Sequence, residues 1–459
     1  MNNEIKDVII IGGGISGLSA LHFIKKKNPQ KQVMLYEADD RLGGTIGTDD
    51  VDGYSFDWGP NGFLDREPLT LQLVDELGIS DKLERANDKV TNRFILRGSK
   101  LRLVPMSPQK FMISDILPLL GKLRLMTEPF ASKRPDGIDE TIYEFVKRRI
   151  GKDAADYLVQ PMVSGIYGGM ADRLSLKSCF PIMREMEDEY GSLFKAMIFK
   201  AKKAKAESKK SGGPSGPGGW LTSFDGGLFK IIEQFESVYK ENIQKGQPVS
   251  SVLKENNYYN IELGNGEKDK AYNIIFALPT YQAANIVTNL SQNLSQAFDS
   301  IPYAPISVVC FGYDKNNVEH NLDGFGFLVP SKEKRKILGS IWSSSIFANR
   351  APDGKVQFRS MIGGDGDHQS INLSDDELIK IVKDDLSKIV GLKGDPETVK
   401  IYRWAQGIPQ FKIGHSDRMD TLENELKNLG NLYVTGNAFY GIGLNDCVKL
   451  SYKVAQEIK

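Results

Sequence analysis

The sequence feature that most limits the fold is a glycine-rich turn that follows an apolar run close to the N-terminus. Val8–Ile11 has the composition of a buried strand, and Gly12-Gly13-Gly14-Ile15-Ser16-Gly17 follows it directly. Apolar residues then recur at helical spacing up to Ile24, and Gln32–Tyr36 reads as a second strand that ends at Glu37. Strand, glycines, helix, strand and acid in this register predict a dinucleotide-binding unit of the Rossmann type.

Each glycine has a separate role in such a unit. Gly12 allows a tight turn after the strand, Gly14 allows the backbone to approach a pyrophosphate, and Gly17 allows the helix to pack closely on the sheet. The free amides of the first helical turn favour phosphate, and Glu37 is placed to accept hydrogen bonds from a ribose hydroxyl. The predicted cofactor contacts in this stretch are Gly12, Gly13, Gly14, Ile15, Ser16, Gly17, Glu37 and Ala38.

The segment after the acid favours a flavin cofactor over a nicotinamide. Arg41-Leu42-Gly43-Gly44 provides two glycines that permit close backbone approach and a guanidinium that can offset phosphate charge. In this run, and in its place after the acid, the chain resembles flavoproteins of the amine-oxidase type. We therefore add Arg41, Gly44 and Thr45 to the predicted cofactor contacts.

Composition sets broad limits on the class of protein. A chain of 459 residues with 40% hydrophobic and 26% charged residues is long enough for two or three domains and is not disordered. Lys+Arg and Asp+Glu both number 59, so net charge argues neither for nor against a polyanionic partner, and no nucleic-acid partner is predicted. Cys179, Cys310 and Cys447 form neither a disulfide framework nor a zinc pattern, so we expect structural thiols and no metal. Since no leader or membrane-spanning run is visible, we expect a cytoplasmic location, with peripheral attachment to the cytoplasmic face of the membrane as an option.

Several further segments resemble the oxygen-dependent protoporphyrinogen oxidase family. Asp57–Phe63 is similar to that family's GPNG or GPRG segment, and Asn92-Arg93-Phe94 is similar to its NRF segment. The other similar segments are Leu103–Pro105, Asp139–Ile142, Gln160–Gly169, Leu174–Pro181, Phe325–Pro330 and Ile341–Arg350. Because the likeness covers most of the chain, the protein is identified as a member of this amine-oxidase-like flavoprotein family.

The resemblance implies an FAD-dependent oxidation of protoporphyrinogen IX to protoporphyrin IX in heme biosynthesis. Six electrons leave in three two-electron steps, and oxygen reoxidises the flavin to give peroxide. Coproporphyrinogen III, with four propionates, is the alternative substrate, although the run Ser343–Arg350 is most similar to the plant protoporphyrinogen enzymes. An amine oxidase or a carotenoid desaturase of the same fold would lack the NRF and Ser164–Gly169 segments, and a flavin-binding membrane adaptor is the non-enzymatic alternative.

The resemblance also assigns site residues. Arg93 corresponds to the arginine at the substrate propionate, Leu328 and Phe347 to apolar side chains that sandwich the ring, and Gly169 to a further substrate contact. Without the resemblance, a surface arginine and ordinary core packing would explain the first three. Asn61 stands where other members carry arginine and is our candidate orienting group. The remaining implied cofactor contacts are Gly59, Pro60, Asn61, Gly62, Val249, Trp404, Gly436, Ile442, Gly443 and Leu444. No general base stands out, because the four histidines form no motif.

The predicted fold is α/β (α+β), with a Rossmann-type FAD-binding domain, a mixed-sheet substrate domain and a helical insertion. The FAD-binding domain comprises residues 1–85, 220–290 and 405–459, and the substrate domain comprises residues 86–100 and 291–404. Residues 101–219 form the helical domain, with a flexible Gly/Pro/Ser linker at 205–219. The strand-like runs behind the mixed sheet are Val308–Tyr313, Phe325–Val329, Ile337–Ile341 and Val356–Ile362.

Two segments of the helical domain raise the question of a membrane contact. Leu101–Pro135 mixes apolar clusters with basic residues, which suits either a lipid-touching insertion or an ordinary helical cap. Phe194–Lys210 is rich in lysine, which suits a solvated helix face first and an anionic membrane surface second. The expected partners are the porphyrinogen and O2, and we also consider a homodimer and hand-over of the product to a ferrochelatase.

Overall fold

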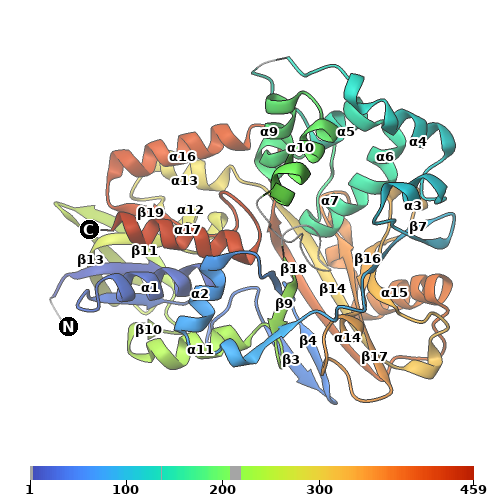
Figure 1. The fold of residues 1–459 in the computed structure, drawn as a ribbon. Helices are drawn as coiled ribbons and strands as arrows, with labels where there is room; N and C mark the ends of the chain where they lie inside the picture. The colour runs from blue at the N-terminus through green and yellow to red at the C-terminus, as the bar shows by residue number, and fades with distance from the viewer. Residues whose placement is uncertain (1–3, 136, 207–218, 459) are drawn as a thin grey trace.

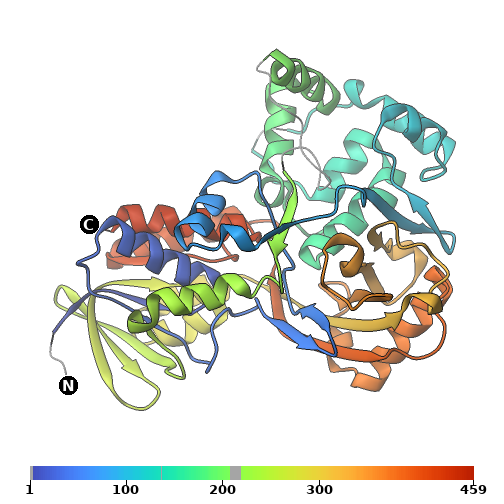
Figure 2. The ribbon, with the colours of Figure 1, turned by 60° about the horizontal axis from the view of Figure 1, so that its bottom comes forward.

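The computed structural model describes residues 4–135, 137–206 and 219–458, without the side chains of 203–206. It contains a seven-stranded sheet between two layers of helices, a second seven-stranded sheet, and a helical part that lies against the second sheet (Figures 1 and 2). Almost all of the linker predicted at 205–219 lies outside the described residues.

The predicted dinucleotide unit forms the middle of the first sheet. β1 (Lys6–Ile11) leads through the glycine turn into α1 (Ile15–Lys27), and β2 (Val33–Tyr36) then pairs with β1 in parallel. On its other side β1 pairs in parallel with β13 (Lys268–Phe276), which pairs with β19 (Leu432–Val434). The remaining strands are β10 (Ile243–Gln244), β11 (Val249–Glu255) and β12 (Tyr258–Leu263). The sheet therefore joins segments from the beginning, the middle and the end of the chain.

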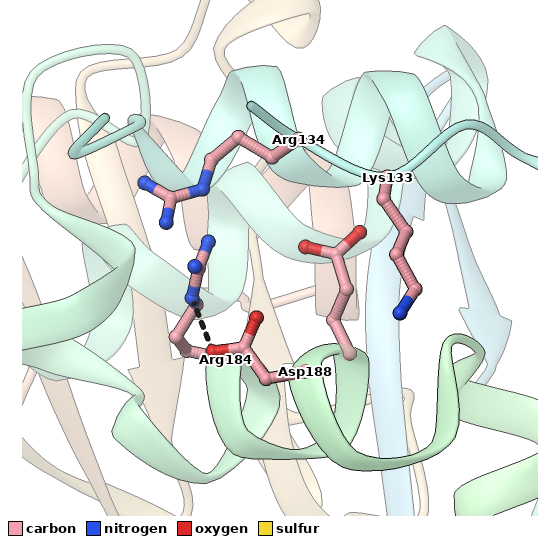
Figure 3. A pocket seen from close by; sticks show the side chains of 5 residues that line it. Lys133, Arg134, Arg184 and Asp188 are labelled. Carbon is pink, nitrogen blue, oxygen red and sulfur yellow. Dashed lines mark hydrogen bonds and ion pairs between the residues drawn. The ribbon is translucent and has the colours of Figure 1, made fainter. Parts of the chain in front are cut away.

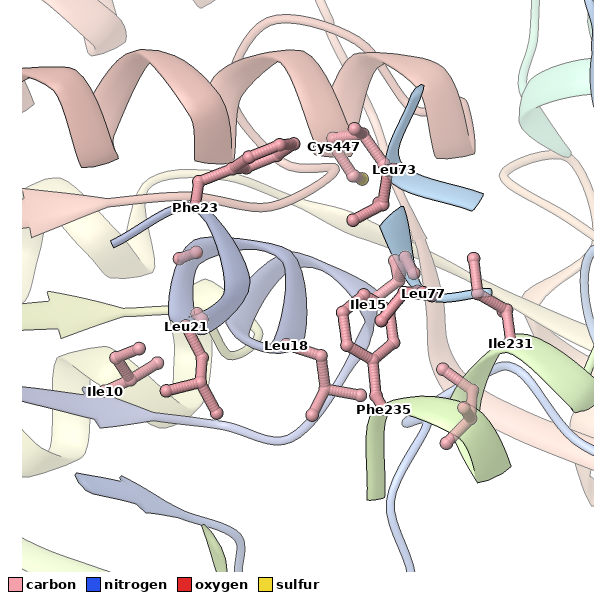
Figure 4. Close-up of a cluster of buried hydrophobic side chains, with 14 of the residues drawn as sticks. Ile10, Ile15, Leu18, Leu21, Phe23, Leu73, Leu77, Ile231, Phe235 and Cys447 are labelled. Carbon is pink, nitrogen blue, oxygen red and sulfur yellow. The ribbon is translucent and has the colours of Figure 1, made fainter. Parts of the chain in front are cut away.

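Alternating side chains of β1 supply two separate cores. Val8 and Ile10 face the layer formed by α1, α2 (Pro68–Glu76), α11 (Lys230–Tyr239) and α17 (Leu444–Glu457), where Leu18 and Leu21 of α1 pack on the sheet (Figure 4). Ile9 and Ile11 face the opposite layer. That layer contains α12 (Thr280–Val287), α13 (Gln292–Asp299) and α16 (His415–Leu429).

The second sheet is mixed, as predicted. Its order is β18 (Thr398–Pro409), β14 (Tyr303–Asp314), β17 (Lys355–Gly363), β16 (Ile337–Ile341), β15 (Gly324–Leu328), β7 (Asn92–Arg97) and β8 (Lys100–Leu103). The four predicted strand runs are confirmed as β14 to β17. α15 (Asp375–Val390) covers one face, and the hairpin β3 (Thr48–Val51) to β4 (Tyr54–Asp57) covers part of the other.

The helical part is held together by buried charges as well as by apolar packing. Its elements are α3 (Pro108–Ile113), α4 (Leu119–Met126), α5 (Ile142–Ile150), α6 (Lys152–Ala154), a π-helical turn (Ala155–Val159), α7 (Gln160–Tyr167), α8 (Leu176–Cys179), α9 (Pro181–Tyr190) and α10 (Leu193–Ala206). Arg149 of α5 is completely buried and pairs with Glu128 and with Glu187 at 3.2 Å. Ser192 and the amides that begin α10 also donate to Glu128, so this carboxylate ties the start of α10 to α5.

A three-stranded sheet joins the two large sheets. β9 (Leu221–Phe224) pairs with β5 (Phe63–Leu64) on one side and with β6 (Leu83–Arg85) on the other. β5 follows the predicted Gly59–Gly62 loop, so this small sheet fixes where that loop lies.

Two strands of the second sheet run past limits of the predicted domains, whose division stays a prediction. β8 extends the second sheet to Leu103, beyond residue 100, and β18 extends it to Pro409, beyond residue 404. Both extensions follow from pairing, of Phe94 with Leu103 and of Tyr303 with Pro409, which local sequence does not reveal. Within the described ranges, the helices are too short or too polar to cross a membrane.

Candidate flavin site

The turn after β1 brings two backbones into direct contact. Gly12 has φ +110° and donates its N–H to Tyr36 O at 2.8 Å. A Cβ on Gly12 would lie 2.5 Å from Ala277 O, and a Cβ on Gly17 would overlap Gly12 O. Glycine is therefore required at both positions for α1 to lie close to β1 and β13.

The N-terminus of α1 is open toward one side. Gly14 is its N-cap, with no side-chain capping bond and no acidic residue in the first turn. A Cβ on Gly14 would meet no described atom within 4 Å. The unpaired amides and the positive end of the helix dipole therefore point to open space, where a pyrophosphate fits.

Glu37 is fixed by the glycine turn itself. Its carboxylate accepts hydrogen bonds from Gly13 N at 2.6 Å and from Asp39 N at 3.0 Å. These bonds hold the half-buried side chain at the carboxyl end of β2. Gln247 N donates to Glu37 O at 2.8 Å, and Val249 then begins β11. Glu37 and Val249, far apart in sequence, are thus brought together, with the exposed Ala38 beside them.

Arg41 closes the loop that lies beside the first glycine turn. Gly43 N donates to Gly13 O at 2.9 Å, and Gly44 lies next to Gly14. Arg41 donates to the carbonyls of Gly44, of Leu42 at 2.9 Å and of Ile46 at 3.2 Å, and its guanidinium lies 4.2 Å above the Trp58 ring. The structure therefore gives Arg41 a role in shaping the loop in addition to the charge that we predicted for phosphate.

The Gly59–Gly62 loop connects this region to the second sheet. A Cβ on Gly59 would overlap Thr45 O, so the loop lies directly against the Arg41 loop. Arg359 of β17 donates to Gly59 O and to Asp57 O at 3.3 Å. The half-buried Asn61 consequently lies where the two sheets meet.

The C-terminal segment supplies a second helix N-terminus. Gly436, with φ +150°, follows β19, and Gly443 caps α17 with its N–H bonded to the Asp446 carboxylate at 3.1 Å. Leu444 shares the buried cluster of Ile15, whereas Ile442 packs on the cluster around Tyr167 in the helical part. The C-terminal glycine segment thus lies between the nucleotide sheet and the helical part.

Trp404 provides a further test of whether a flavin fits. Its indole Nε1 is buried and has no hydrogen-bond partner among the described residues. Buried N–H groups almost always have an acceptor, and a flavin carries two ring carbonyl oxygens that can serve as one. The indoles of Trp58 and Trp342 are unpartnered in the same way among the described residues, so the contact of Trp404 with the flavin stays a prediction. The open N-terminus of α1 and the glycine-rich loops beside it agree with a flavin.

On the substrate side, Arg93 lies on an aromatic ring. Its Cζ is 4.6 Å above the centre of Phe325, and burial lowers the pKa of its guanidinium, which still carries its charge at neutral pH. Leu328, two strand positions beyond Gly326, packs on Gly165 of α7. The parallel pairing of β7 with β15 brings Arg93 to Phe325 and places Leu328 opposite Ile95.

Phe347 and Gly169 lie deeper than the prediction suggests. Phe347 is 1% exposed and belongs to a buried cluster on which Phe325 and Leu221 pack, with Arg350 stacked 5.2 Å from its ring. Gly169 follows α7 and lies against Gln410 and Leu174. Their contact with substrate stays a prediction. In the structure, Phe347 belongs to the buried cluster on which Phe325 packs.

Contacts link the predicted cofactor residues to the predicted substrate residues without a break. Gly14 lies beside Gly44, and Thr45 touches Gly59. A Cβ added to Gly62 would lie 3.2 Å from the Leu221 side chain. Leu221 packs on the same cluster as Phe325, which carries Arg93.

Sequence reasoning missed residues that build this junction. Trp58 supports Arg41, Phe325 supports Arg93, and Arg359 holds the Gly59 loop. Trp58 and Phe325 stand inside the segments that resembled the family and could have been chosen from there. Arg359 lies in the middle of a strand with no local signal.

The buried histidines and cysteines lie in surroundings that favour their uncharged forms. Burial lowers the pKa of His22, whose ring lies between Glu76 and Tyr239, and the pKa of His415, which stacks on Phe411. Burial also raises the pKa of Cys310 to about 12 and of Cys447 to about 11, so both thiols stay protonated at neutral pH. In the part of the chain that the structure describes, no group of three His, Cys, Asp or Glu residues could hold a metal.

Comparison with known proteins identifies the family. The sequence profile of the flavin-containing amine oxidoreductases matches residues 15–459. The chain belongs to this family. It is therefore a flavin-dependent oxidoreductase. This confirms the flavin cofactor that we predicted from Arg41–Gly44.

Individual relatives agree with the resemblance to porphyrinogen oxidases. Coproporphyrinogen III oxidase of Bacillus subtilis (strain 168) is 31% identical, with 98% of this chain and 97% of the relative covered. Chloroplastic protoporphyrinogen oxidase 1 of Arabidopsis thaliana is also 31% identical, with 98% and 88% covered. The crystal structure of a candidate protoporphyrinogen oxidase from Exiguobacterium sp. 255-15 superimposes with a TM-score of 0.85 at 26% identity, covering 99% of both chains.

We predict that Gly14→Val removes the flavin without unfolding the protein. Gly14 has φ −72° and ψ 175°, which valine adopts readily, and its side chain would enter the space where we place the pyrophosphate. Loss of the glycine N-cap should cost about 1 kcal/mol. The flavin absorbance per chain should fall to near zero while circular dichroism is unchanged and Tm drops by a few degrees.

Gly17→Val is the contrasting variant, because its side chain would strike Gly12 O and should disturb folding itself. A Gly14→Val protein with its full flavin content would remove the N-terminus of α1 from the cofactor site.

Proposed function

We propose that this chain is an FAD-dependent oxidase that converts protoporphyrinogen IX to protoporphyrin IX. Its likeness to plant protoporphyrinogen oxidases along almost the whole chain supports this function. The structural observation that carries it is the guanidinium of Arg93 lying on Phe325, which packs on the same cluster as Leu221 beside the Gly59–Gly62 loop. A cation bordered by apolar side chains suits a flat apolar macrocycle that bears carboxylates.

The side chains divide the work of binding. Arg93 pairs with a propionate, because a guanidinium donates two parallel hydrogen bonds to a carboxylate. Phe325 keeps that guanidinium in place by stacking, and Leu328 offers an aliphatic surface to the ring. Asn61, at the meeting of the two sheets, orients the reacting part of the substrate through its amide.

The cofactor residues hold the other half of the reaction. Bound FAD supplies the two-electron acceptor that oxygen regenerates. Glu37 and the amides of α1 bind its dinucleotide portion, and the loops around Gly44 and Gly59 fix the distance between cofactor and substrate. The pyrrole nitrogens of the substrate release their protons to water, so no histidine or carboxylate is needed as a base.

Coproporphyrinogen III is the second candidate substrate. The named coproporphyrinogen III oxidases of Bacillus subtilis and Staphylococcus aureus are 31% and 29% identical to this chain, as close as the plant enzymes. Anaerobic mixing of the flavin-loaded protein with each porphyrinogen tests the proposal. Rapid loss of flavin absorbance with protoporphyrinogen IX is expected, faster coproporphyrinogen III turnover would reverse the choice, and no bleaching with either would exclude the function.

We predict that the cofactor is FAD and is bound without a covalent tether. The glycine turns and Glu37 form a dinucleotide site, which FMN would leave half used. Heat denaturation followed by filtration should release all yellow colour, and chromatography of the filtrate should give FAD. Colour that stays on the chain, or FMN in the filtrate, would contradict this prediction.

We predict that Arg93→Ala binds FAD normally and loses activity. A charged pair with a propionate in a partly desolvated pocket contributes about 2 to 5 kcal/mol, so kcat/KM should fall by at least about thirtyfold. The loss should appear mainly in KM, because the propionate contact is alike in the ground and transition states.

Arg85→Ala is the matched control, since Arg85 is an exposed arginine on β6 that pairs with Asp65. Arg93 would leave the substrate site if its variant kept the kcat/KM of the control, or if it lost FAD together with activity.

We predict peripheral membrane binding through the segment Leu101–Pro135. The structure exposes large apolar side chains there, among them Ile113 (86% exposed), Leu120 (78%) and Phe130 (89%). Vesicle co-sedimentation should show binding that high salt reduces but does not abolish, because salt screens only the lysine contribution. Protein that stays entirely in the supernatant would leave these helices as an ordinary cap.

The homodimer, the hand-over to a ferrochelatase and the cytoplasmic location stay predictions.

A further inference from the structure

A cavity of about 620 Å³ lies between the β7–β8 hairpin and the beginning of the helical part. It is separate from the Arg93–Phe325 contact and from every glycine turn described above. The residues that matter for its chemistry are Arg97, Arg102, Asp115, Lys122, Tyr157 and Glu333. The cavity is large enough for a phosphate group with a short polar attachment.

Two arginines face this cavity from the same side of the hairpin. Ile95 pairs with Arg102, and Arg97 lies two residues after Ile95, so strand alternation places both arginines on one face. Arg97 donates to the backbone carbonyl of Asp115 at 2.6 Å, and Arg102 pairs with the Asp115 carboxylate. Nε of Arg102 is buried and has no hydrogen-bond partner in the described ranges. A charged donor in that position calls for an acceptor.

Lys122 and Tyr157 complete the wall. Lys122 is 7% exposed and donates to the backbone carbonyls of Ser114 and, at 2.9 Å, of Met112, which are neutral acceptors. Tyr157 belongs to the π-helical turn, a rare form of helix that is frequent at functional sites, and the Arg97 Cζ lies 4.9 Å from its ring centre.

The charges of the lining leave the cavity positive. Arg97, Arg102 and Lys122 contribute three positive charges, against Asp115 and Glu333. Glu333 is occupied by the hairpin turn, where Gly98 N donates to its carboxylate at 2.9 Å. An anion in the cavity would therefore meet cationic donors first.

Apolar side chains border the same cavity. Ser114 and Pro118 line it, and their sequence neighbours Ile113 and Leu119 are 86% and 68% exposed. Leu120, next along α4, is exposed as well. A cationic hollow bordered by protruding aliphatic side chains matches the order of groups in a phospholipid, in which a phosphate stands where the acyl chains begin.

We propose that this cavity binds the phosphate of an anionic glycerophospholipid. Arg97 and Arg102 hold the phosphate oxygens, Lys122 adds positive charge behind them, and Ile113, Leu119 and Leu120 enter the acyl region. The cavity thus makes the attachment selective for headgroup chemistry, beyond what apolar burial provides. This assignment does not depend on which porphyrinogen the flavin site oxidises.

A second hollow supplies the matched control. It has a volume of about 270 Å³ and lies between the loop at Lys133 and Arg134 and helix α9 (Figure 3). Arg184 there pairs with Asp188 at 2.8 Å, and Glu187 is engaged by Arg148 and Arg149. Nη1 of Arg184, like Nε of Arg102, is buried without a hydrogen-bond partner among the described residues, so the control also tests whether such a nitrogen alone attracts the lipid. Arg184→Gln changes the net charge of the protein as Arg102→Gln does, but Arg184 lies on α9, outside the proposed site.

The experiment measures partition of the flavin-loaded full chain onto phosphatidylcholine vesicles with and without phosphatidic acid. The wild-type protein should prefer the vesicles with phosphatidic acid. Arg97→Gln and Arg102→Gln should each lower that preference roughly fivefold, the contribution of one basic residue at an anionic surface. Arg184→Gln should keep it, and binding to phosphatidylcholine alone should be equal in all four proteins. Equal losses in the three variants would show general charge attraction and overturn the proposal.

A second measurement uses the wild-type protein and guards against variants that fold poorly. Short-chain, water-soluble phosphatidic acid should raise Tm at concentrations where inorganic phosphate does not, because binding to the folded state alone stabilises it. If inorganic phosphate raises Tm equally and the vesicles show no headgroup preference, the cavity is a free-anion site and the lipid assignment is wrong. Absence of any shift with the soluble lipid would also overturn it.

Discussion

The contact between the backbone of α1 and the strands β1 and β13 is the constraint on which the rest of the structure depends. Gly12 and Gly17 let the helix approach until no Cβ fits between, and Ala277 of the chain leaving β13 lies against the same turn. This close approach points the amides of α1 at the carboxyl ends of the parallel strands. The Arg41 loop, the Gly59 loop and α17 are all positioned relative to that edge.

Buried polar groups as well as apolar packing join the β3–β4 hairpin and the Gly59 loop to the second sheet. Asp57, at the end of β4, accepts from Thr48 at 2.7 Å and lies 3.7 Å from the buried Arg350, while Arg359 donates to the carbonyls on either side of Trp58. Such bonds fix direction more sharply than apolar contacts do. The placement of the predicted substrate residues relative to the predicted cofactor residues therefore rests on a junction of defined geometry.

Much of the nucleotide half could be predicted from sequence, because the turn between β1 and α1 and the acid after β2 are local patterns. The strands of the second sheet were also visible as apolar runs. The contact of Arg93 with Phe325 was not, since it requires parallel pairing between β7 and β15, which are separated in sequence by the helical part and by β9 to β14. Resemblance to a family suggested Arg93 and Phe347, but only the packing shows that Phe347 lies behind Phe325. The buried charges around Arg149 had no sequence signal, because Glu128, Glu187 and Ser192 come from three separate segments of the chain.

The order of segments in the first sheet has a consequence for biosynthesis. β1 and β2 leave the ribosome early, whereas β19 and α17, which cover β13 and α1, are made last. Until then the apolar faces of α1 and β13 have no complete covering, and the second helix N-terminus of the cofactor site does not exist. Flavin capture should therefore follow the synthesis of α17, and a cell short of flavin would accumulate apoprotein that already contains this helix in place of shorter fragments.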